Sequence, residues 1–477
     1  MTLRPALAVR DAVAMVRQCT PDRYHVRAPA LSRAEIAGDF AARFAGIPAN
    51  NLTRTEDVAL YTVADGAQLP VLLGLYGDAA RVGSWLPGLP RHTNRRAVSR
   101  LLSATRKPEV RTNPACQEVT TTSGVDLGTL PVLQATPRDA GPYLTMGMLY
   151  AQDAHSGETA LSVHRMLVLD RTRLTLWMVP GRRLRALHEA TMRRNEPLPV
   201  SINIGAPPAV MIASAVNGRF LPDGVTKLDV AGALAGEPIA LAPALSQPTL
   251  VLAESEIVLE GFLDTTVADE CVSGTVGISL PEFLGYDGAA RTGLPVVTVT
   301  AMTMRRSAVY QAVIGPGREQ SVILGMAGAL SVALSGDDED WRMIRDLHFS
   351  PAGGGMLLLV VAVCKDSPEA DLRLPGIARR LFSEHPFIKV IVFTDEDIEV
   401  TSVEDVFWAM TTRANLGTDC TTLPDFSPLA MDPSQSDDWA AARGRDGATG
   451  RTFIDATVPY RLRGQVVRSY PATFEEC

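Results

Sequence analysis

The acidic residue with the most potential for chemistry is Glu282, which lies between Pro281 and Phe283. Its other neighbours along the chain are mostly apolar: Ile278, Leu280, Leu284 and Tyr286. Taking a charged carboxylate out of water is costly, so an apolar setting favours the protonated acid. We therefore expect Glu282 to act as a proton donor near neutral pH. The structural alternative is a β-hairpin whose acidic residues are exposed to water.

Two further glutamates, Glu256 and Glu260, flank a short apolar run. Residues four apart on a strand point to the same face, where two like charges repel each other. A divalent metal ion bound through carboxylate oxygens would relieve this repulsion, and so would exposure to water. The pattern leaves both interpretations open.

An arginine follows the run Ser162-Val163-His164, and apolar residues follow it as far as Leu169. A strand that is apolar on both sides is typical of a buried strand. A buried arginine needs an acidic partner. Arg165 is therefore a candidate binding residue, although a single arginine in a strand is more often a surface residue.

A strand, a glycine turn and a helix start follow one another between Ile204 and Ser214. Such a turn can direct backbone N–H groups at an anion. A plain structural turn explains the same pattern.

The composition narrows the class of protein. The chain has 477 residues, 46% hydrophobic and 21% charged, which is typical of a globular protein with a large core. The net charge, 45 − 53 = −8, argues against a nucleic-acid partner. The start of the chain does not resemble a signal peptide, and the longest apolar run, from Met356 to Cys364, is too short to cross a membrane. Six scattered cysteines, with no CxxC pair, favour the cytoplasm.

The order of apolar runs predicts a mixed α/β (α+β) fold in three parts. Residues 1–115 form an α/β segment, residues 116–320 are rich in strand patterns, and residues 321–477 are α/β again with a polar tail. In the last part, a helix over 372–383 lies between strand runs at 357–363 and 388–393. This order predicts a parallel βαβ unit.

Several of these segments resemble the signature series of the UbiD family, decarboxylases that use prenylated FMN. The matching runs are ESEIVLEGFLD at 254–264, PEFLGYDG at 281–288 and AMTMRRSAVYQAVI at 301–314. Two later segments, at 388–397 and 406–413, are similar to its C-terminal signatures. The resemblance implies a split β-barrel of the flavin-reductase type at 116–320 that binds the cofactor, and a C-terminal domain used in dimerisation.

The resemblance also implies roles for named residues. Glu282 would donate a proton, Arg165 would orient the substrate carboxylate, and Glu270 would replace a second catalytic glutamate. The cofactor-binding residues would be Ser162, Val163, His164, Arg165, Gly205, Pro207, Ala213, Ser214, Lys389 and Arg413. The metal ligands would be Glu256, Glu260 and Ser214, around Mn²⁺ and K⁺.

The chain departs from the family pattern at three places. The position of a metal-binding asparagine, five residues before the motif arginine, holds Ala160. The segment 176–182 lacks the expected metal-binding histidine, and His164 is out of register with it, as a structural histidine would be. The first glutamate of the acid motif is matched by Gly277, so Glu270 or Asp269, which precede an apparent insertion, is its proposed substitute.

The implied function is non-oxidative, reversible decarboxylation of an aromatic, heteroaromatic or α,β-unsaturated carboxylic acid. Only Arg318 in the segment 317–329 could bind a second carboxylate, which favours a monoacid. The implied partners are a flavin prenyltransferase that supplies the cofactor and further copies of the chain, as a homodimer or higher oligomer. Two alternatives are a flavin-dependent oxidoreductase, for which the GxGxxG fingerprint is missing, and a non-catalytic subunit that binds prenylated FMN.

Overall fold

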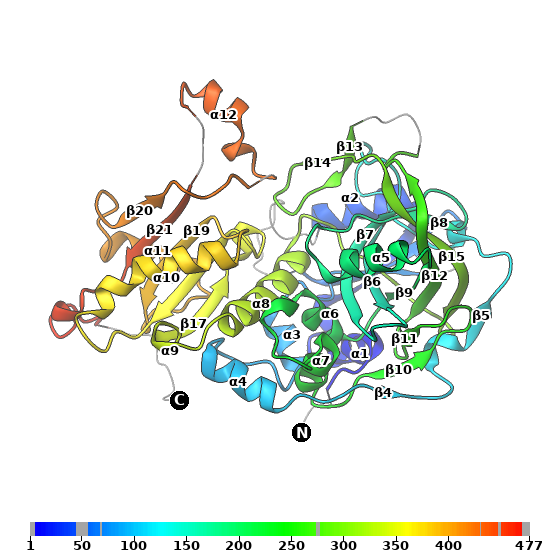
Figure 1. Cartoon of the computed structure of the whole chain (residues 1–477), viewed down its shortest axis with the longest axis horizontal. Helices are drawn as coiled ribbons and strands as arrows, with labels where there is room; N and C mark the ends of the chain where they lie inside the picture. Colours follow the sequence, from blue (N-terminus) through cyan, green and yellow to red (C-terminus); the bar gives the residue numbers. More distant parts are fainter. Residues whose placement is uncertain are drawn as a thin grey trace. The chain divides into compact units, whose positions relative to one another are not determined.

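The computed structural model describes residues 5–43, 56–66, 69–272, 277–429, 431–446 and 450–469. The chain forms two compact units (Figure 1). The first comprises Met1–Leu89, Ala104–Ala215 and Gly224–Gln320, and the second comprises Pro90–Ser103, Val216–Asp223 and Ser321–Cys477. The predicted boundary at 115 therefore lies inside the first unit, whereas the predicted start of the last domain coincides with Ser321. The end of the predicted tail, 470–477, lies outside the described residues.

A large antiparallel sheet forms the centre of the first unit (Figure 1). Its order is β5-β15-β12-β9-β6-β7, and β8 also pairs with β15. The strands are β5 (Val119–Thr121), β6 (Tyr143–Gln152), β7 (Thr159–Leu167), β8 (Arg173–Thr175), β9 (Leu198–Ile204), β12 (Ile257–Ala268) and β15 (Leu294–Met304). One isolated bridge, between Val168 and Leu174, links the end of β7 to β8. Within the described residues, the strand pairing does not close into a barrel.

The register of this sheet aligns large apolar side chains in rows across neighbouring strands. Leu149 lies opposite Ile202, Ile202 opposite Leu259, and Leu259 opposite Met302. All four belong to one buried core. Because side chains alternate along a strand, this row fixes which face of β7 looks toward the core. Ser162, which lies opposite Leu149, is on that core-facing side.

Helices and shorter strands complete the first unit. Two of its helices are α5 (Arg183–Arg193) and α6 (Pro208–Ala215), and α6 confirms the helix start predicted after the glycine turn. Thr226 and Asp229 form a capping box at the start of α7 (Lys227–Ala235). A small sheet contains β4 (Glu109–Val110), β10 (Ala240–Pro243) and β11 (Leu250–Leu252), and a hairpin contains β13 (Ile278–Pro281) and β14 (Asp287–Ala289).

The N-terminal segment forms a second sheet, with a strand from much later in the chain. Its order is β1-β2-β3-β16, from β1 (Tyr24–Leu31), β2 (Val58–Val63), β3 (Val71–Leu73) and β16 (Tyr310–Gln311). The helices of this segment are α1 (Val9–Cys19), α2 (Arg33–Arg43) and α3 (Ala79–Trp85). Before α2, the Glu35 carboxylate accepts from the Ser32 backbone N–H at 2.9 Å, which is one half of a capping box.

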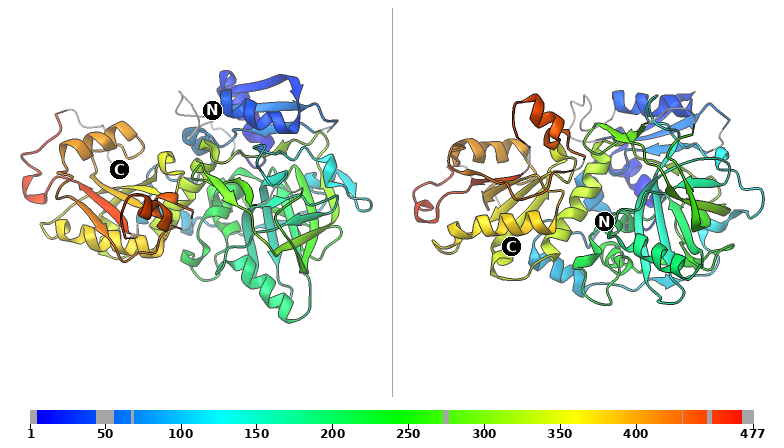
Figure 2. Two further views of the ribbon diagram at one scale, coloured as in Figure 1. Left: turned by 90° about the horizontal axis from the view of Figure 1, so that it is seen from above. Right: turned by 45° about the horizontal axis from the view of Figure 1, so that its top comes forward.

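The second unit contains the predicted βαβ element. Its sheet has the order β17-β18-β19-β21-β20, and β18 pairs with β19 in parallel. The strands are β17 (Ile344–Phe349), β18 (Leu358–Val363), β19 (Val390–Asp395), β20 (Cys420–Leu423) and β21 (Arg451–Ala456). Figure 2 shows α10 (Ala370–Glu384) and α11 (Val403–Thr412) on opposite faces of this sheet. Shorter helices are α4 (Arg95–Ser103), α9 (Glu339–Met343) and α12 (Asp437–Ala442), and α8 (Arg318–Leu334) contains the boundary between the units. A mixed α/β fold is thus confirmed.

In the described part of the chain, no helix is long and apolar enough to cross a membrane.

A buried carboxylate at the start of α8 joins this helix to the N-terminal sheet. Both oxygens of Glu319 accept backbone hydrogen bonds at 2.9 Å, from Gly74 and Tyr76. Glu319 is 1% exposed, and its backbone N–H donates to a second carboxylate, Glu56. Burial, together with the charge of Glu56, raises the pKa of Glu319 to about 8.

The raised pKa predicts that stability falls as pH rises from 4.5, the ordinary value, to about 8. In this window the folded protein keeps a proton on Glu319 that the unfolded chain has lost, so raising the pH favours unfolding. We expect this group to contribute a loss of up to about 5 kcal/mol across the window, and Glu319→Gln to remove it. Urea unfolding at several pH values measures the slope. The exposed Glu237→Gln is the control, and an unchanged slope in Glu319→Gln would contradict the assignment.

Candidate active site

Arg165 and Glu282 form an ion pair in the first unit. The Arg165 Nη1 atom lies 2.9 Å from Glu282 Oε1. The two side chains are 20% and 18% exposed, so a small molecule can reach both. Glu282 is therefore the acidic partner that a buried arginine was expected to need, and the two residues come from β7 and from the turn after β13.

Apolar packing holds the two charged residues in position. Leu167 lies two residues after Arg165 on β7, and Leu280 lies two residues before Glu282. Both leucines pack in one buried cluster with Ala140 and Tyr143. The turn that carries Glu282 is closed by its backbone N–H, which donates to the Tyr286 carbonyl at 2.8 Å. The apolar cluster therefore sets how β7 and the hairpin align.

Glu270, the proposed second catalytic glutamate, is 3% exposed and has its own partners. Its carboxylate accepts from the Tyr143 hydroxyl at 3.1 Å and from the Arg291 backbone N–H at 3.2 Å. Burial and the charge of Glu270 raise the pKa of Tyr143, and the positive charge of Arg165 acts in the opposite direction. Glu270 thus lies close to the Arg165 pair without an ion pair to it among the described residues.

A cavity of about 680 Å³ lies beside the segment that contains Arg291. Its lining includes Trp177, Arg185, His188, Glu189 and Arg291. The Arg291 guanidinium lies 4.0 Å from the centre of the Trp177 ring, which is a cation–π contact. Its Nε atom is buried and has no hydrogen-bond acceptor in the described structure. Sequence reasoning missed Tyr143, Trp177 and Arg291, because nothing in their local patterns indicates that they meet in space.

The predicted cofactor-binding run Ser162–Arg165 alternates between two faces of β7. Ser162 Oγ lies 2.8 Å from His164 Nε2, and His164 Nδ1 lies 3.1 Å from the Trp177 carbonyl. A carbonyl only accepts, so Nδ1 donates and Nε2 accepts from the serine. Burial lowers the pKa of His164 to about 4, which keeps it neutral at pH 7. Ser162 and His164 share one face, so side chains from all four residues cannot meet a ligand on a single face.

Lys227, which sequence reasoning missed, ties this strand to α6. Its amine donates to the Leu161 carbonyl at 3.1 Å and to the Ser214 carbonyl. The residue as a whole is partly exposed, but its amine lies deep enough that burial, followed by the charge of Arg182, lowers its pKa to about 8. The predicted neighbours of the cofactor, Ser162 and Ser214, therefore adjoin a lysine amine.

The glycine turn before α6 has a steric cause. Gly205 has φ +67°, and a Cβ atom there would lie 2.7 Å from Cγ of Glu256. Only glycine adopts this conformation so close to another side chain without strain. Pro207 and Pro208 follow, and Pro208 is the first residue of α6. This turn and helix start are as predicted, and the contact ties them to β12.

The predicted metal ligands are occupied by protein groups. Glu256 is fully buried, and its two oxygens accept from Arg10 Nε at 2.8 Å and Arg10 Nη2 at 3.0 Å. Glu260 accepts from the backbone N–H groups of Leu245 at 2.9 Å and Ser246 at 2.6 Å. The Ser214 hydroxyl donates to the carbonyl of Met211 in its own helix.

These residues do not fit a metal ion. Across the described ranges, no group of three or more His, Cys, Asp or Glu side chains is arranged to hold one. The prediction of Glu256, Glu260 and Ser214 as ligands of Mn²⁺ or K⁺ is therefore not supported. The physical reason is Arg10, a cation from α1 that satisfies Glu256 from 246 residues away.

Two family models together, and curated relatives, match the chain over most of its length. The 3-octaprenyl-4-hydroxybenzoate carboxy-lyase Rift-related domain of UbiD matches residues 108–319, and the corresponding C-terminal domain matches residues 330–456. A gallate decarboxylase from Lactiplantibacillus plantarum is 32% identical over 338 residues, which cover 70% of this chain and 69% of that protein. The chain belongs to the UbiD family. Its relatives are named decarboxylases, and this chain is a UbiD-family carboxy-lyase.

Solved structures of UbiD-family decarboxylases have the same fold as the whole chain. Klebsiella pneumoniae 3,4-dihydroxybenzoic acid decarboxylase in its apo form superposes with a TM-score of 0.86 at 29% identity, over 98% of both chains. The UbiD-class enzyme HmfF from Pelotomaculum thermopropionicum, in complex with FMN, gives a TM-score of 0.81 at 26% identity, over 98% of this chain and 97% of that one.

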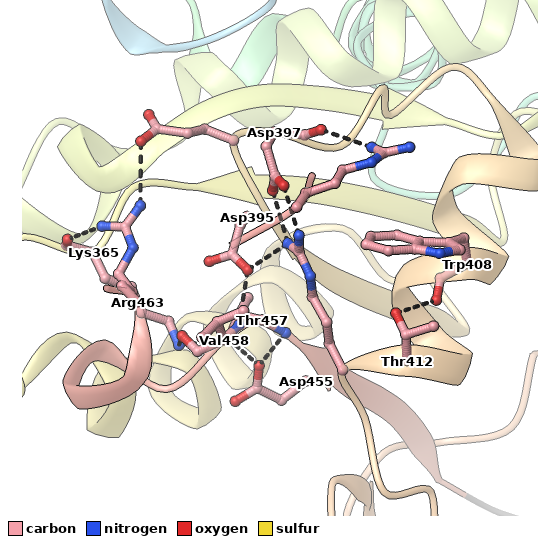
Figure 3. Close-up of polar contacts among 12 residues, drawn as sticks. Lys365, Asp395, Asp397, Trp408, Thr412, Asp455, Thr457, Val458 and Arg463 are labelled. Carbon is pink, nitrogen blue, oxygen red and sulfur yellow. Dashed lines mark hydrogen bonds and ion pairs between the residues drawn. The ribbon is translucent and has the colours of Figure 1, made fainter. Parts of the chain in front are cut away.

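Lys389 and Arg413, the cofactor-binding candidates in the second unit of this UbiD-family chain, both pair with acids there. Lys389 Nζ lies 2.5 Å from Asp432 Oδ2. Arg413 Nη1 lies 2.8 Å from Asp395 Oδ2, and Nη2 lies 2.6 Å from Asp397 Oδ2. Figure 3 shows Asp395, Asp397 and Trp408 in this network. Structural ion pairs account for both cations, so we do not assign them to the cofactor.

The Tyr143–Glu270 hydrogen bond predicts a stability effect. Tyr143→Phe removes a donor from a buried carboxylate, which we expect to lower the free energy of unfolding by about 1–3 kcal/mol. Tyr150, on the same strand, is 3% exposed, and its hydroxyl has no hydrogen-bond partner in the described structure. Tyr150→Phe is therefore the matched control in urea unfolding. Equal effects of the two substitutions would show that the hydrogen bond contributes nothing.

Proposed function

We propose that this chain catalyses the non-oxidative, reversible decarboxylation of an aromatic carboxylic acid with prenylated FMN. The observation that carries the proposal is the accessible Arg165–Glu282 pair, which offers a cation for a carboxylate beside a group that can donate a proton. The membership in the UbiD family supports the reaction class.

Exchange of carboxylates on Arg165 explains how the pair would work. In the free protein the Arg165 guanidinium pairs with the Glu282 carboxylate at 2.9 Å. A substrate carboxylate would take the place of Glu282 on Arg165, and the released Glu282 would then carry a proton from solvent to the substrate. The bond from carbon to the carboxylate then breaks, CO₂ leaves, and Glu282 gives its proton to the carbon. Each turnover consumes one proton and releases one CO₂.

The apolar cluster beside the Arg165–Glu282 pair would favour conversion of the charged substrate carboxylate into neutral CO₂. Leu167, Leu280 and Tyr143 pack under it and limit access of water. A carboxylate that becomes neutral CO₂ loses its need for solvation, so a site that excludes water favours the product. Glu270 accepts from the Tyr143 hydroxyl and, among the described residues, makes no ion pair with Arg165, so it does not compete for the guanidinium.

The flavin would bind where β7, the Gly205 turn and α6 meet. When bound, prenylated FMN would supply the electron sink for the reaction. HmfF from Pelotomaculum thermopropionicum has been solved with FMN and, as an evolved dimeric form, with prFMN. Ser162, Gly205, Pro207, Ala213 and Ser214 are the residues of this chain proposed to hold it. The bridge between Val168 and Leu174 supports a split barrel around this position, since it links the end of β7 to β8, which pairs with β15.

The relatives narrow the proposed substrate class. A gallate decarboxylase and a 3,4-dihydroxybenzoic acid decarboxylase are similar to this chain over most of its length. Both names denote hydroxylated benzoic acids that carry a single carboxyl group. We infer that a hydroxylated benzoic acid of this kind is the substrate, in agreement with the monoacid expected from the sequence.

Two further elements of the proposal concern assembly and supply. The exposed apolar residues Phe407 and Trp408 on α11 support a homodimer that uses the second unit. A flavin prenyltransferase would supply the cofactor, and the cytoplasm, where thiols stay reduced, suits the described cysteines, all of which are free.

Removal of the proton donor tests the proposal. Glu282→Gln keeps the size of the side chain but has no proton to give, so we expect CO₂ release from gallate or 3,4-dihydroxybenzoate to fall by about 10²–10⁴-fold. Gas or coupled assays on the protein loaded with prenylated FMN measure the rate, with bound cofactor determined by absorbance. Asp287→Asn, an exposed acid on the adjacent strand, is the control and should retain activity.

Two results would overturn the proposal. Full activity of Glu282→Gln would exclude Glu282 as the donor. A wild-type protein that binds prenylated FMN but releases no CO₂ from any tested acid would favour a non-catalytic subunit.

A further inference from the structure

Lys227 has an unused donor beside the proposed cofactor site. An ammonium group has three N–H donors. Two of them are accounted for by the carbonyls of Leu161 and Ser214. The third has no acceptor among the described residues. Leu161 precedes the predicted cofactor-binding run on β7, and Ser214 ends the predicted run on α6, so the amine lies between the two segments.

The surroundings of this amine carry no compensating negative charge. Within the described ranges, no carboxylate lies at ion-pair distance from Lys227 Nζ. The titratable groups that act on Lys227 or on His164 are these two residues themselves and Arg182. All three are basic. A cation removed from water without a counter-ion is unfavourable, so the arrangement favours binding of an anion.

The residues expected to hold a metal ion for the same anion do not offer free ligands. Arg10 occupies both oxygens of Glu256, and Ala160 provides no ligand. A phosphate group at this position therefore needs its positive charge from a side chain. A lysine supplies it as a point charge, with strong charge-assisted hydrogen bonds.

We propose that Lys227 binds the phosphate of the flavin cofactor and replaces a metal ion in this chain. The inference rests on the proposed function only in taking FMN or its prenylated form as the ligand. The alternative role for Lys227 is purely structural, as a tie between β7 and the end of α6.

Comparison of FMN with riboflavin separates these roles, because the two ligands differ only in the phosphate. Flavin fluorescence quenching gives the dissociation constant of each for the full-length protein, in sodium buffer with EDTA and again with Mn²⁺ and K⁺. The proposal predicts that FMN binds at least about tenfold more tightly than riboflavin. It also predicts that EDTA weakens FMN binding by less than about twofold and that elemental analysis finds no stoichiometric metal.

Substitution of the lysine provides the second arm. We expect Lys227→Met to weaken FMN binding about tenfold or more while leaving riboflavin binding within about twofold, and Lys227→Arg to retain part of the preference for FMN. The matched control is Lys107→Met. Lys107 is a 72% exposed lysine that pairs with Asp229, a residue of α7, the helix that also contains Lys227. Circular dichroism establishes whether each variant is folded.

Each outcome decides between the proposals. FMN binding by wild type that requires Mn²⁺ would overturn the role of Lys227 and leave the decarboxylase proposal intact. Equal losses of FMN and riboflavin in a folded Lys227→Met would assign Lys227 a structural role. Absence of flavin binding under all conditions would contradict both proposals. If Lys227→Met does not fold, the dependence of wild-type binding on metal and on the phosphate still decides the question.

Discussion

The ion pair between Arg165 and Glu282 requires β7 and the β13–β14 hairpin to align, and much of the first unit serves that alignment. Leu167 and Leu280 pack against Tyr143 and fix the two segments relative to each other. Tyr143 in turn holds Glu270, so apolar packing and polar contacts depend on the same residue. A charged pair that stays accessible in an otherwise buried setting is poised to exchange one carboxylate for another. This property connects the fold to the chemistry.

Compensation of buried charge explains the other polar features of the first unit. Glu256 is compensated by Arg10, and Glu260 by backbone N–H groups of a loop. Glu319 also accepts two backbone N–H groups, but it lies next to Glu56 and retains a proton to a higher pH than an exposed glutamate. Lys227 differs from these groups because its described partners are neutral carbonyls. That difference identifies it as a place where a ligand would complete the structure.

Local signals in the sequence predicted the elements that depend on local physics. The Ser32–Glu35 cap, the start of α6 at Pro208 and the βαβ unit around α10 all follow from capping residues, proline geometry and apolar periodicity. The Arg165–Glu282 pair was predictable because each residue lies in a recognisable motif of the UbiD family.

The remaining contacts join residues that no local pattern connects. Arg10 meets Glu256 across 246 positions, and this contact removes the metal site that the two glutamates suggested. Tyr143 and Glu270 are 127 positions apart. Lys227 follows a helix cap and has the sequence context of a surface lysine, and its role depends on carbonyls of two other elements. The sequence therefore did not reveal the long-range contacts that satisfy buried charged groups, whereas it did reveal elements of the secondary structure.

The central claim is that a substrate carboxylate displaces Glu282 from Arg165 and that Glu282 then takes up a proton. Calorimetric titration of the FMN-loaded protein with 3,4-dihydroxybenzoate, in buffers of different ionisation enthalpy, measures the protons bound per ligand, with CO₂ release monitored to exclude turnover. The account predicts net uptake approaching one proton per ligand at neutral pH, and almost none in Glu282→Gln. Tight binding to the wild-type protein with no proton uptake would contradict it.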